Sequence, residues 1–419
     1  MQRHILKELI AFAGALALAG CLGGAPSSSG GGSGGGSDPG STGGGSSGGT
    51  GSGSGTGSGS GTGTGSGSTA ASPLDARTID YGQALRTAAL KLIGTLPTMD
   101  EQASVKDAAS YAAQVDKYLA DARFPAQMTS YFRDMMKMGG SLAGANNTKI
   151  SLETAPTFAA ELVVQDRSMM DLFTATTNTC PTLNTTTGAF TDAPCAVANG
   201  LVTSGVLTDP GAMGQFFSNM AFRRVRWVQE SFVCTKFPAE YSATPVAKGN
   251  GQYVSPWAFD SITGGTDKNL APVNFQDVSS VVCANCHTTM NHIAPLFANF
   301  NAAGVFQTTI QVQTPVPMTP TTKLSDWLPA GQQDTAWRFG KPVKSLTELG
   351  AAMAADPDVA DCQVARAWNW AMSKTDIVND LATVPQSTIS TLETQFTTGG
   401  YKLKPVLRAI FNHDDFVKF

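Results

Sequence analysis

Charged side chains are scarce in this chain of 419 residues, where Asp, Glu, Lys and Arg together make up 14%. Lys and Arg number 28 against 32 Asp and Glu, which gives a formal net charge of −4. A nucleic-acid binder normally shows a basic excess on one face, so the composition argues against that class of protein. The sequence also lacks an apolar run of the roughly 18 residues that a membrane-spanning helix needs, which argues against a polytopic membrane protein.

Histidine is rare, with four residues in the chain, and the H-E-x-x-H pattern of zinc proteases is missing. Strand signals are weak throughout, whereas apolar residues recur at helical spacing, so we expect a mainly α fold. Helices are predicted at Gln83–Leu96, after Pro97-Thr98, from Pro125, from Asp209-Pro210 through Val233, and at Leu346–Ala355, Val359–Ser373 and Lys402–Asn412. The methionines Met135, Met136, Met138, Met169 and Met170 are interpreted as core packing rather than as metal ligands.

The first 21 residues have the pattern of a secretory signal. Arg3 and Lys7 give a basic start, and Leu9 to Gly20 form a short apolar core that ends in Leu18-Ala19-Gly20-Cys21. Small residues before a Cys are typical of the bacterial lipobox, so we expect Cys21 to be lipidated. Because Leu22 rather than Asp follows Cys21, the outer membrane is the expected destination, with the globular part in the periplasm or on the cell surface.

A Gly/Ser tract follows from residue 22 to 72, where 38 of 51 residues are Gly or Ser and Asp38 is the one charged residue. Such a composition buries too little apolar surface to fold, so we expect a disordered tether. A flexible coil of this length has an end-to-end distance of roughly 40 Å.

The pattern that carries chemistry is Cys283-Ala284-Asn285-Cys286-His287, which is typical of c-type haem attachment. Two thiols one helical turn apart can form thioethers to the two vinyl groups on one haem edge, and His287 can then ligate the iron. A Cys283–Cys286 disulfide and a zinc half-site are the alternatives, although no second Cys/His pair has the spacing to complete a zinc site. We expect one covalently attached haem c.

The haem surroundings are predicted from the residues downstream. Pro295 lies in an apolar stretch, and its carbonyl is the candidate partner for the second nitrogen of His287. Met318, in a Pro-flanked loop, is the candidate distal ligand, ahead of Met353 and Met372 or an open iron. His292 is too close to His287 in sequence to reach the opposite haem face well, and His413 is expected at the surface.

Four cysteines remain once Cys21, Cys283 and Cys286 are assigned. An even remainder in an exported protein indicates two disulfides, for which we expect the pairs Cys180–Cys195 and Cys234–Cys362. Buried free thiols are the alternative. Arg223, Arg224 and Arg226 could contact a partner or the haem propionates, but we favour a solvated helix face with Trp227 packed inward.

The stretch from Cys283 to Gly304 resembles exported cytochrome-c-domain lipoproteins that contain adjoining domains of unknown function. In that family C-x-x-C-H is followed by Met-Asp-Pro, an Asn-Phe and a Gly, and this chain keeps Met290, Pro295, Asn299, Phe300 and Gly304. It departs from the pattern at Asn291, in extra residues before Pro295, and at Val225, where the family has Gly. The resemblance implies haem and export, without an assigned reaction.

We therefore interpret the chain as a membrane-tethered, extracytoplasmic monohaem cytochrome that exchanges electrons with a redox protein partner. The expected parts are a signal (1–21), a tether (22–72), a helical domain (73–200), a connecting segment (201–274), a small cytochrome-c-like haem domain (275–375) and a closing helical segment (376–419). An electron carrier is favoured over an enzyme. The alternatives are a haem-dependent or peroxidase-like oxidoreductase and a surface binding module that carries haem.

Overall fold

The computed structural model describes residues 76–144, 149–235, 246–248, 251–253, 289–312, 334–376, 384 and 386–419. The expected signal, Cys21 and the Gly/Ser tract lie outside the described residues. Residues 70–419 form one compact unit. In the described part the fold is mainly α, as predicted.

The helices fall into three groups along the chain. The first group is α1 (Tyr81–Leu92), α2 (Met99–Ser104), α3 (Ala108–Leu119), α4 (Phe124–Met136), α5 (Thr154–Val164) and α6 (Asp171–Thr174). The second is α7 (Pro210–Gln215), η3 (Asn219–Ala221), α8 (Phe222–Phe232) and η4 (Ala294–Phe297). The third is η6 (Arg338–Gly340), α10 (Leu346–Ala354), α11 (Pro357–Ala371), α12 (Gln386–Thr398), α13 (Leu403–Phe411) and α14 (Asp414–Val417).

Strands occur in the described part as short antiparallel pairs, in keeping with the weak strand signals. The pairs are β1 (Ser141–Ala143) with β2 (Lys149–Ser151), β3 (Thr182–Asn184) with β4 (Ala189–Thr191), β5 (Val246–Lys248) with β6 (Gly251–Tyr253), and β7 (Ala336–Trp337) with β8 (Lys341–Pro342). None of these pairs forms a larger sheet, so helix packing builds the core.

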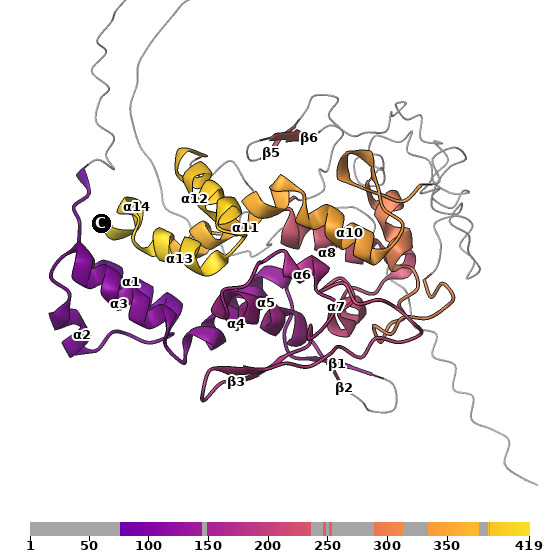
Figure 1. Cartoon of the computed structure of the whole chain (residues 1–419), viewed down its shortest axis with the longest axis horizontal. Coiled ribbons are helices and arrows are strands. Elements are labelled where there is room, and N and C mark those ends of the chain that lie inside the picture. Colours follow the sequence, from indigo (N-terminus) through magenta and orange to yellow (C-terminus); the bar gives the residue numbers. More distant parts are fainter. Residues whose placement is uncertain are drawn as a thin grey trace, which may run out of the picture. The chain divides into compact units, whose positions relative to one another are not determined.

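The last helices of the chain pack on the first ones. In Figure 1, α13 and α14 lie beside α1 and α3. The backbone N–H of Asp80 donates to the carbonyl of Val417 at 2.9 Å, and the buried hydroxyl of Tyr111 donates to the carbonyl of Phe411 at 2.8 Å. The expected closing segment thus completes the N-terminal helical layer.

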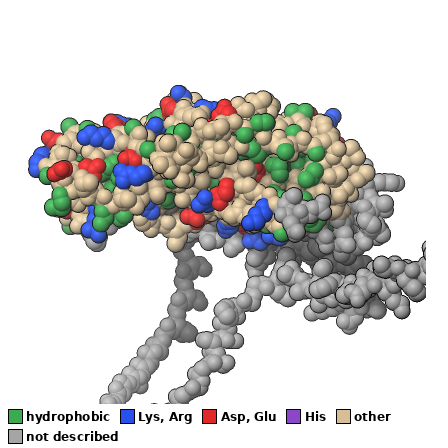
Figure 2. All heavy atoms as spheres, turned by 90° about the horizontal axis from the view of Figure 1, so that it is seen from below, with side chains coloured by type: hydrophobic (Ala, Val, Ile, Leu, Met, Phe, Trp, Pro, Cys, Tyr) green, Lys and Arg blue, Asp and Glu red, His purple; other side chains and the backbone are tan. Residues whose placement is uncertain are grey.

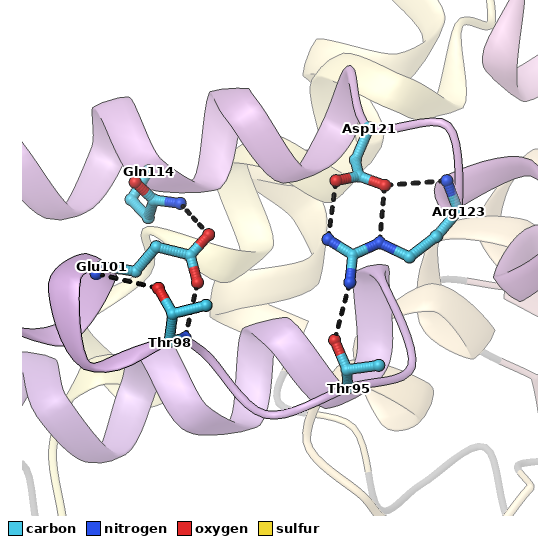
Figure 3. Close-up of polar contacts among 6 residues, drawn as sticks. All are labelled: Thr95, Thr98, Glu101, Gln114, Asp121 and Arg123. Atoms are coloured by element: carbon cyan, nitrogen blue, oxygen red, sulfur yellow. Dashed lines mark hydrogen bonds and ion pairs between the residues drawn. The ribbon is translucent and has the colours of Figure 1, made fainter.

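Local capping explains where the early helices begin (Figure 3). The Thr98 hydroxyl accepts a hydrogen bond from the Glu101 backbone N–H, and the Glu101 carboxylate accepts one from the Thr98 backbone N–H. This capping box opens α2 as the acidic first turn predicted. Gln114 of α3 donates to the same carboxylate, while Arg123 forms a two-point contact with Asp121 and reaches Thr95.

The helical region expected from Asp209 through Val233 is present, but it is divided into three helices. Met220 and Ala221 have positive φ angles of 67° and 59°, which break it into α7, η3 and α8. Neither residue is Gly or Asn, so the sequence gives no turn signal there. The first helix also ends at Leu92, four residues early, because Gly94 with φ 71° terminates it.

The methionine-rich positions lie in the core, as predicted. Met136 and Met169 are fully buried, and Met135, Met138 and Met170 are at most 7% exposed. On the face drawn in Figure 2, basic and acidic side chains are intermixed rather than gathered by sign. Among the described residues, no helix combines the length and the apolar character needed to cross a membrane.

Two disulfides join the cysteine pairs expected from the sequence. Cys180–Cys195 has a sequence separation of 15 and encloses the β3–β4 pair, whereas Cys234–Cys362 has a separation of 128 and joins the end of α8 to α11. Cys234 and Cys362 are 2% and 1% exposed, while Cys180 is half-buried. The long-range bond therefore lies within the core and the short-range bond lies nearer the surface.

This difference predicts the order in which the disulfides open. Under native conditions a small thiol reductant should reduce Cys180–Cys195 first, because a reductant must reach a sulfur atom to attack it. Alkylation during a timed reduction, followed by peptide mass spectrometry, measures the order. Earlier alkylation of Cys234 and Cys362 in the still-folded protein would contradict the prediction.

Candidate functional site

The expected haem-binding residues Cys283, Cys286 and His287 and the candidate ligand Met318 lie outside the described residues. The described chain resumes at Thr289, two residues after His287. The structure describes the chain from Thr289 onward and, before the motif, the chain up to residue 235 with residues 246–248 and 251–253.

The segment that follows the motif is buried from its first residues. Residues 289–293 form a helical turn that leads into η4, with Ile293 and Phe297 fully buried and Phe300 1% exposed. Pro295 is half-buried in the first turn of η4, and its carbonyl accepts the N–H of Ala298 at 3.2 Å. A carbonyl oxygen has two lone pairs, so this bond leaves Pro295 able to accept a second one.

Both ends of the segment containing Met318 are hydrogen-bonded to the residues after the motif. The N–H of Gln311 donates to the carbonyl of Ala298 at 2.9 Å, and Val312 is buried next to it in sequence. On the far side, the Nδ1 atom of His292 lies 2.7 Å from the carbonyl oxygen of Asp334. The described residues that flank 313–333 are thus bonded to residues 292–298.

His292 is a structural anchor at this point. Its side chain is 3% exposed, and burial lowers its pKa below the usual value, so the ring is neutral at neutral pH. Because a carbonyl can only accept, Nδ1 carries the proton and Nε2 is the basic nitrogen. The sequence placed His292 close to His287 but gave no sign of its bond to Asp334.

Arg224 of α8 joins the post-motif segment to the helical core. Its side chain is fully buried, and each of its five N–H donors has a backbone carbonyl partner. The contacts are Nε and Nη2 to Met213 at 2.9 and 2.6 Å, Nη1 to Phe297 and Phe300 at 2.8 and 3.2 Å, and Nη2 to Asn301 at 3.2 Å. In Figure 1, α8 lies against the orange segment that contains η4.

Arg224 also differs in charge pairing from the other buried arginines of the described part. Arg338 pairs with Asp356 and Asp358, and Arg366 pairs with Asp376 at 3.3 Å. Arg224 contacts carbonyl oxygens and the rings of Phe217 and Phe300, with no carboxylate partner among the described residues. Burial lowers its pKa to about 9, so the side chain stays charged at neutral pH.

The expectation that all three arginines lie on a solvated helix face was wrong for Arg224. Arg223 and Arg226 are exposed and Trp227 packs inward at 3% exposure, as expected. Arg224 instead shares the buried stripe of Val225 and Val228. Arg224 and Val225 precede Val228 by four and three residues, a spacing that places them on one helix face. The charge of Arg224, however, favours an exposed position in a sequence-based prediction. Since all five donors are occupied, Arg224 does not bind a propionate directly.

A second buried polar cluster surrounds Asp209, the N-cap of α7. Its carboxylate accepts hydrogen bonds from the Ala212 backbone N–H and the Thr154 hydroxyl, and lies 3.7 Å from the Cys180 sulfur. Ligand atoms of Cys180, Cys195 and Asp209 lie within 4.8 Å of one another. The sulfurs are joined in a disulfide and carry no thiolate, so the cluster serves to cap α7 rather than to hold a metal.

The remaining candidate ligands have structural surroundings. Met353 is fully buried in α10, and Met372, half-buried, follows the end of α11. His413 is half-buried rather than fully at the surface; its ring caps α14 by accepting the N–H of Asp415, and its edge contacts Trp368.

The Cys-Cys-His set would supply the two thioether sulfurs and the axial nitrogen of a covalently bound haem. The described chain from Thr289 to Asn301 is largely buried and is fixed by Arg224 and His292. Comparison of the chain with protein-family models, with curated proteins and with solved structures found no match.

Replacing Arg224 should cost far more stability than replacing its exposed neighbour. Arg224→Gln removes charge-assisted hydrogen bonds and leaves buried carbonyls without donors, so we expect a loss of at least about 3 kcal/mol in the free energy of unfolding. Arg226→Gln, which removes an exposed contact to Glu230, should change it by less than about 0.5 kcal/mol. Denaturant unfolding followed by circular dichroism measures both; equal effects would contradict the role of Arg224.

The contributions of two N-cap aspartates to folding stability should change with pH in opposite directions. Burial raises the pKa of Asp209 to about 6 in the folded protein. Its protonation therefore stabilises the fold fully below about pH 4, and this stabilisation is lost as pH rises through 6. Hydrogen bonds from Ser110 lower the pKa of Asp107, the exposed N-cap of α3, so its contribution is lost as pH falls through that lowered pKa.

The test compares Asp209→Asn and Asp107→Asn with the wild type across pH. As pH rises from about 4 to 7, Asp209→Asn should gain unfolding free energy relative to the wild type. As pH rises from the lowered pKa of Asp107 to above the ordinary value of 3.8, Asp107→Asn should lose it. Differences of the same sign in the two windows would refute the assignment.

Proposed function

We propose that this chain is a membrane-tethered, extracytoplasmic monohaem c-type cytochrome that carries electrons. The observation that carries the proposal is Cys283-Ala284-Asn285-Cys286-His287, a spacing that matches the two vinyl groups and the iron of one haem. Cys21 would hold the lipid anchor in the outer membrane, and residues 22–72 would serve as the tether.

The disulfides support an extracytoplasmic location. Disulfides persist in oxidising compartments, and bacterial haem c is likewise attached outside the cytoplasm. Two bonds, Cys180–Cys195 and Cys234–Cys362, use all four cysteines that the lipid anchor and the haem would leave. The proposal therefore assigns a role to each of the seven cysteines.

The chain's own residues would hold and position the group. Cys283 and Cys286 would each add their thiol across a vinyl group, and His287 would place a ring nitrogen on the iron. The bound haem would supply a one-electron Fe(III)/Fe(II) couple. Ile293, Phe297 and Phe300, buried in the segment that follows the motif in sequence, would limit the access of water.

Met318 remains the proposed distal ligand. Gln311 is seven residues before it and bonds to Ala298, while Asp334 bonds to His292, so the described residues that flank its segment bond to the chain that follows the motif. Seven residues span at most roughly 24 Å, which limits how far Met318 can lie from Gln311.

Covalent haem is tested with the full chain produced in a host that matures haem c. The reduced protein should show an α-band that survives acid–acetone extraction. Cys283→Ser/Cys286→Ser should lose it, whereas the control Cys180→Ser/Cys195→Ser should keep it, since those sulfurs form a structural disulfide. Absence of the band from the wild type, or its removal by extraction, would refute covalent attachment.

The distal ligand is tested by absorbance of the oxidised protein. Methionine ligation gives a weak band at about 695 nm, which Met318→Ala should abolish. Met372→Ala is the control, because Met372 is half-buried whereas truncating the fully buried Met353 would disturb the core. Retention of the band in Met318→Ala would exclude Met318.

Carbon monoxide separates the carrier from the peroxidase-like alternative. A haem with two protein ligands should not bind CO in the ferrous state under native conditions, because neither axial position is open. Rapid CO binding together with peroxide turnover would favour the enzyme.

A further inference from the structure

A cavity of about 270 Å³ is lined by residues of α4, of α11 and of the chain just after α11. This volume is close to the lower end of the roughly 300–1,000 Å³ of small-molecule sites, so the cavity suits a ligand as small as a single amino acid. Tyr131 and Trp370 contribute aromatic rings whose centroids are 5.1 Å apart, and Met135 adds apolar surface. None of the residues assigned above to haem binding lines this cavity.

Arg366 lines the cavity and retains a buried hydrogen-bond donor. Its side chain is 3% exposed, and its two terminal nitrogens donate to the carbonyls of Met135 at 3.2 Å and Glu230 at 2.8 Å. The Nε atom lies 3.3 Å from the carboxylate of Asp376 but has no hydrogen-bond partner among the described residues. A buried N–H without an acceptor is costly, so a ligand that brings an acceptor to it gains affinity.

Asn369 lines the same cavity and retains a buried acceptor. Its side chain is 3% exposed, and Nδ2 donates to the carbonyl of Thr375 at 3.1 Å. Because a carbonyl can only accept, this bond fixes which amide atom is the nitrogen. The other atom, Oδ1, is buried and has no hydrogen-bond partner in the described part of the chain. Asn369 follows Arg366 by three residues in α11, so the two side chains are neighbours on one helix face.

The charges around the cavity cancel. Arg366 and Lys374 contribute two positive charges, and Asp134 and Asp376 contribute two negative ones. A ligand that is only a cation or only an anion would leave a net charge in a partly buried site, which is unfavourable. A neutral ligand that carries one charge of each sign avoids this cost.

We propose that this cavity binds a small zwitterion, an α-amino acid with an aromatic side chain. The ligand carboxylate accepts from Nε of Arg366, and the ligand ammonium donates to Oδ1 of Asn369. The ligand ring packs against Tyr131 and Trp370. An α-amino acid has both charged groups on one carbon, which suits a donor and an acceptor that are adjacent on one helix. The inference goes beyond the proposed function and does not depend on the haem.

The first test is isothermal titration calorimetry of the full chain at pH 7 with three matched ligands. L-Phenylalanine should bind with a Kd of about 1 mM or tighter. 2-Phenylethylamine lacks the carboxylate and 3-phenylpropanoate lacks the ammonium, so each should bind at least about tenfold more weakly, since each loses a charge-assisted hydrogen bond. Absence of L-phenylalanine binding up to about 10 mM, or equal affinity for either of the other two ligands, would overturn the inference.

The second test removes the acceptor. Asn369→Leu should weaken L-phenylalanine binding at least about tenfold. Asn412→Leu is the matched control, because the Asn412 amide also donates to a backbone carbonyl but does not line the cavity, and it should bind as the wild type does. Circular dichroism checks that both variants are folded.

Trp370→Leu carries the mutational test if Asn369→Leu fails to fold. Trp370 is half-buried, and its replacement removes one aromatic wall, so we expect a loss of about tenfold in affinity for L-phenylalanine. The inference is overturned if a folded Asn369→Leu or Trp370→Leu protein binds L-phenylalanine as the wild type does, or if Asn412→Leu loses as much affinity as they do.

Discussion

The five hydrogen bonds of the Arg224 guanidinium are the constraint on which the middle of the structure depends. They gather carbonyls from the end of α7, from η4 and from the turn after it onto α8. No one of these short elements buries enough apolar surface to be stable alone. The buried guanidinium therefore fixes α7, η4 and the turn after η4 in one arrangement, because any shift would leave some of its N–H donors without a hydrogen-bond partner.

The same helix is linked to two other parts of the described chain. Cys234, just past the end of α8, is bonded to Cys362 of α11, and the chain returns at Thr289 to a segment bonded to Arg224. His292 and Ala298 bond to Asp334 and Gln311, the described residues near the two ends of 313–333.

The sequence predicted the features that have a local signature. Capping residues and apolar spacing indicated most helices, and cysteine parity indicated both disulfides. The break at Met220–Ala221 was missed because it depends on tertiary packing rather than on Gly or Pro. Arg224 was missed because its four partners are backbone carbonyls, which every residue has and no sequence pattern marks. The motif residues and Met318 lie outside the described residues, so the haem assignment stays a prediction.

The central claim is that one haem is attached to the chain through Cys283 and Cys286. Peptide mass spectrometry of the matured protein tests it most directly, after reduction and alkylation. The account predicts that the peptide containing residues 283–287 carries the mass of one haem and no alkyl group, while Cys180, Cys195, Cys234 and Cys362 become alkylated only after reduction. Alkylated Cys283 and Cys286 in a haem-free peptide would contradict it.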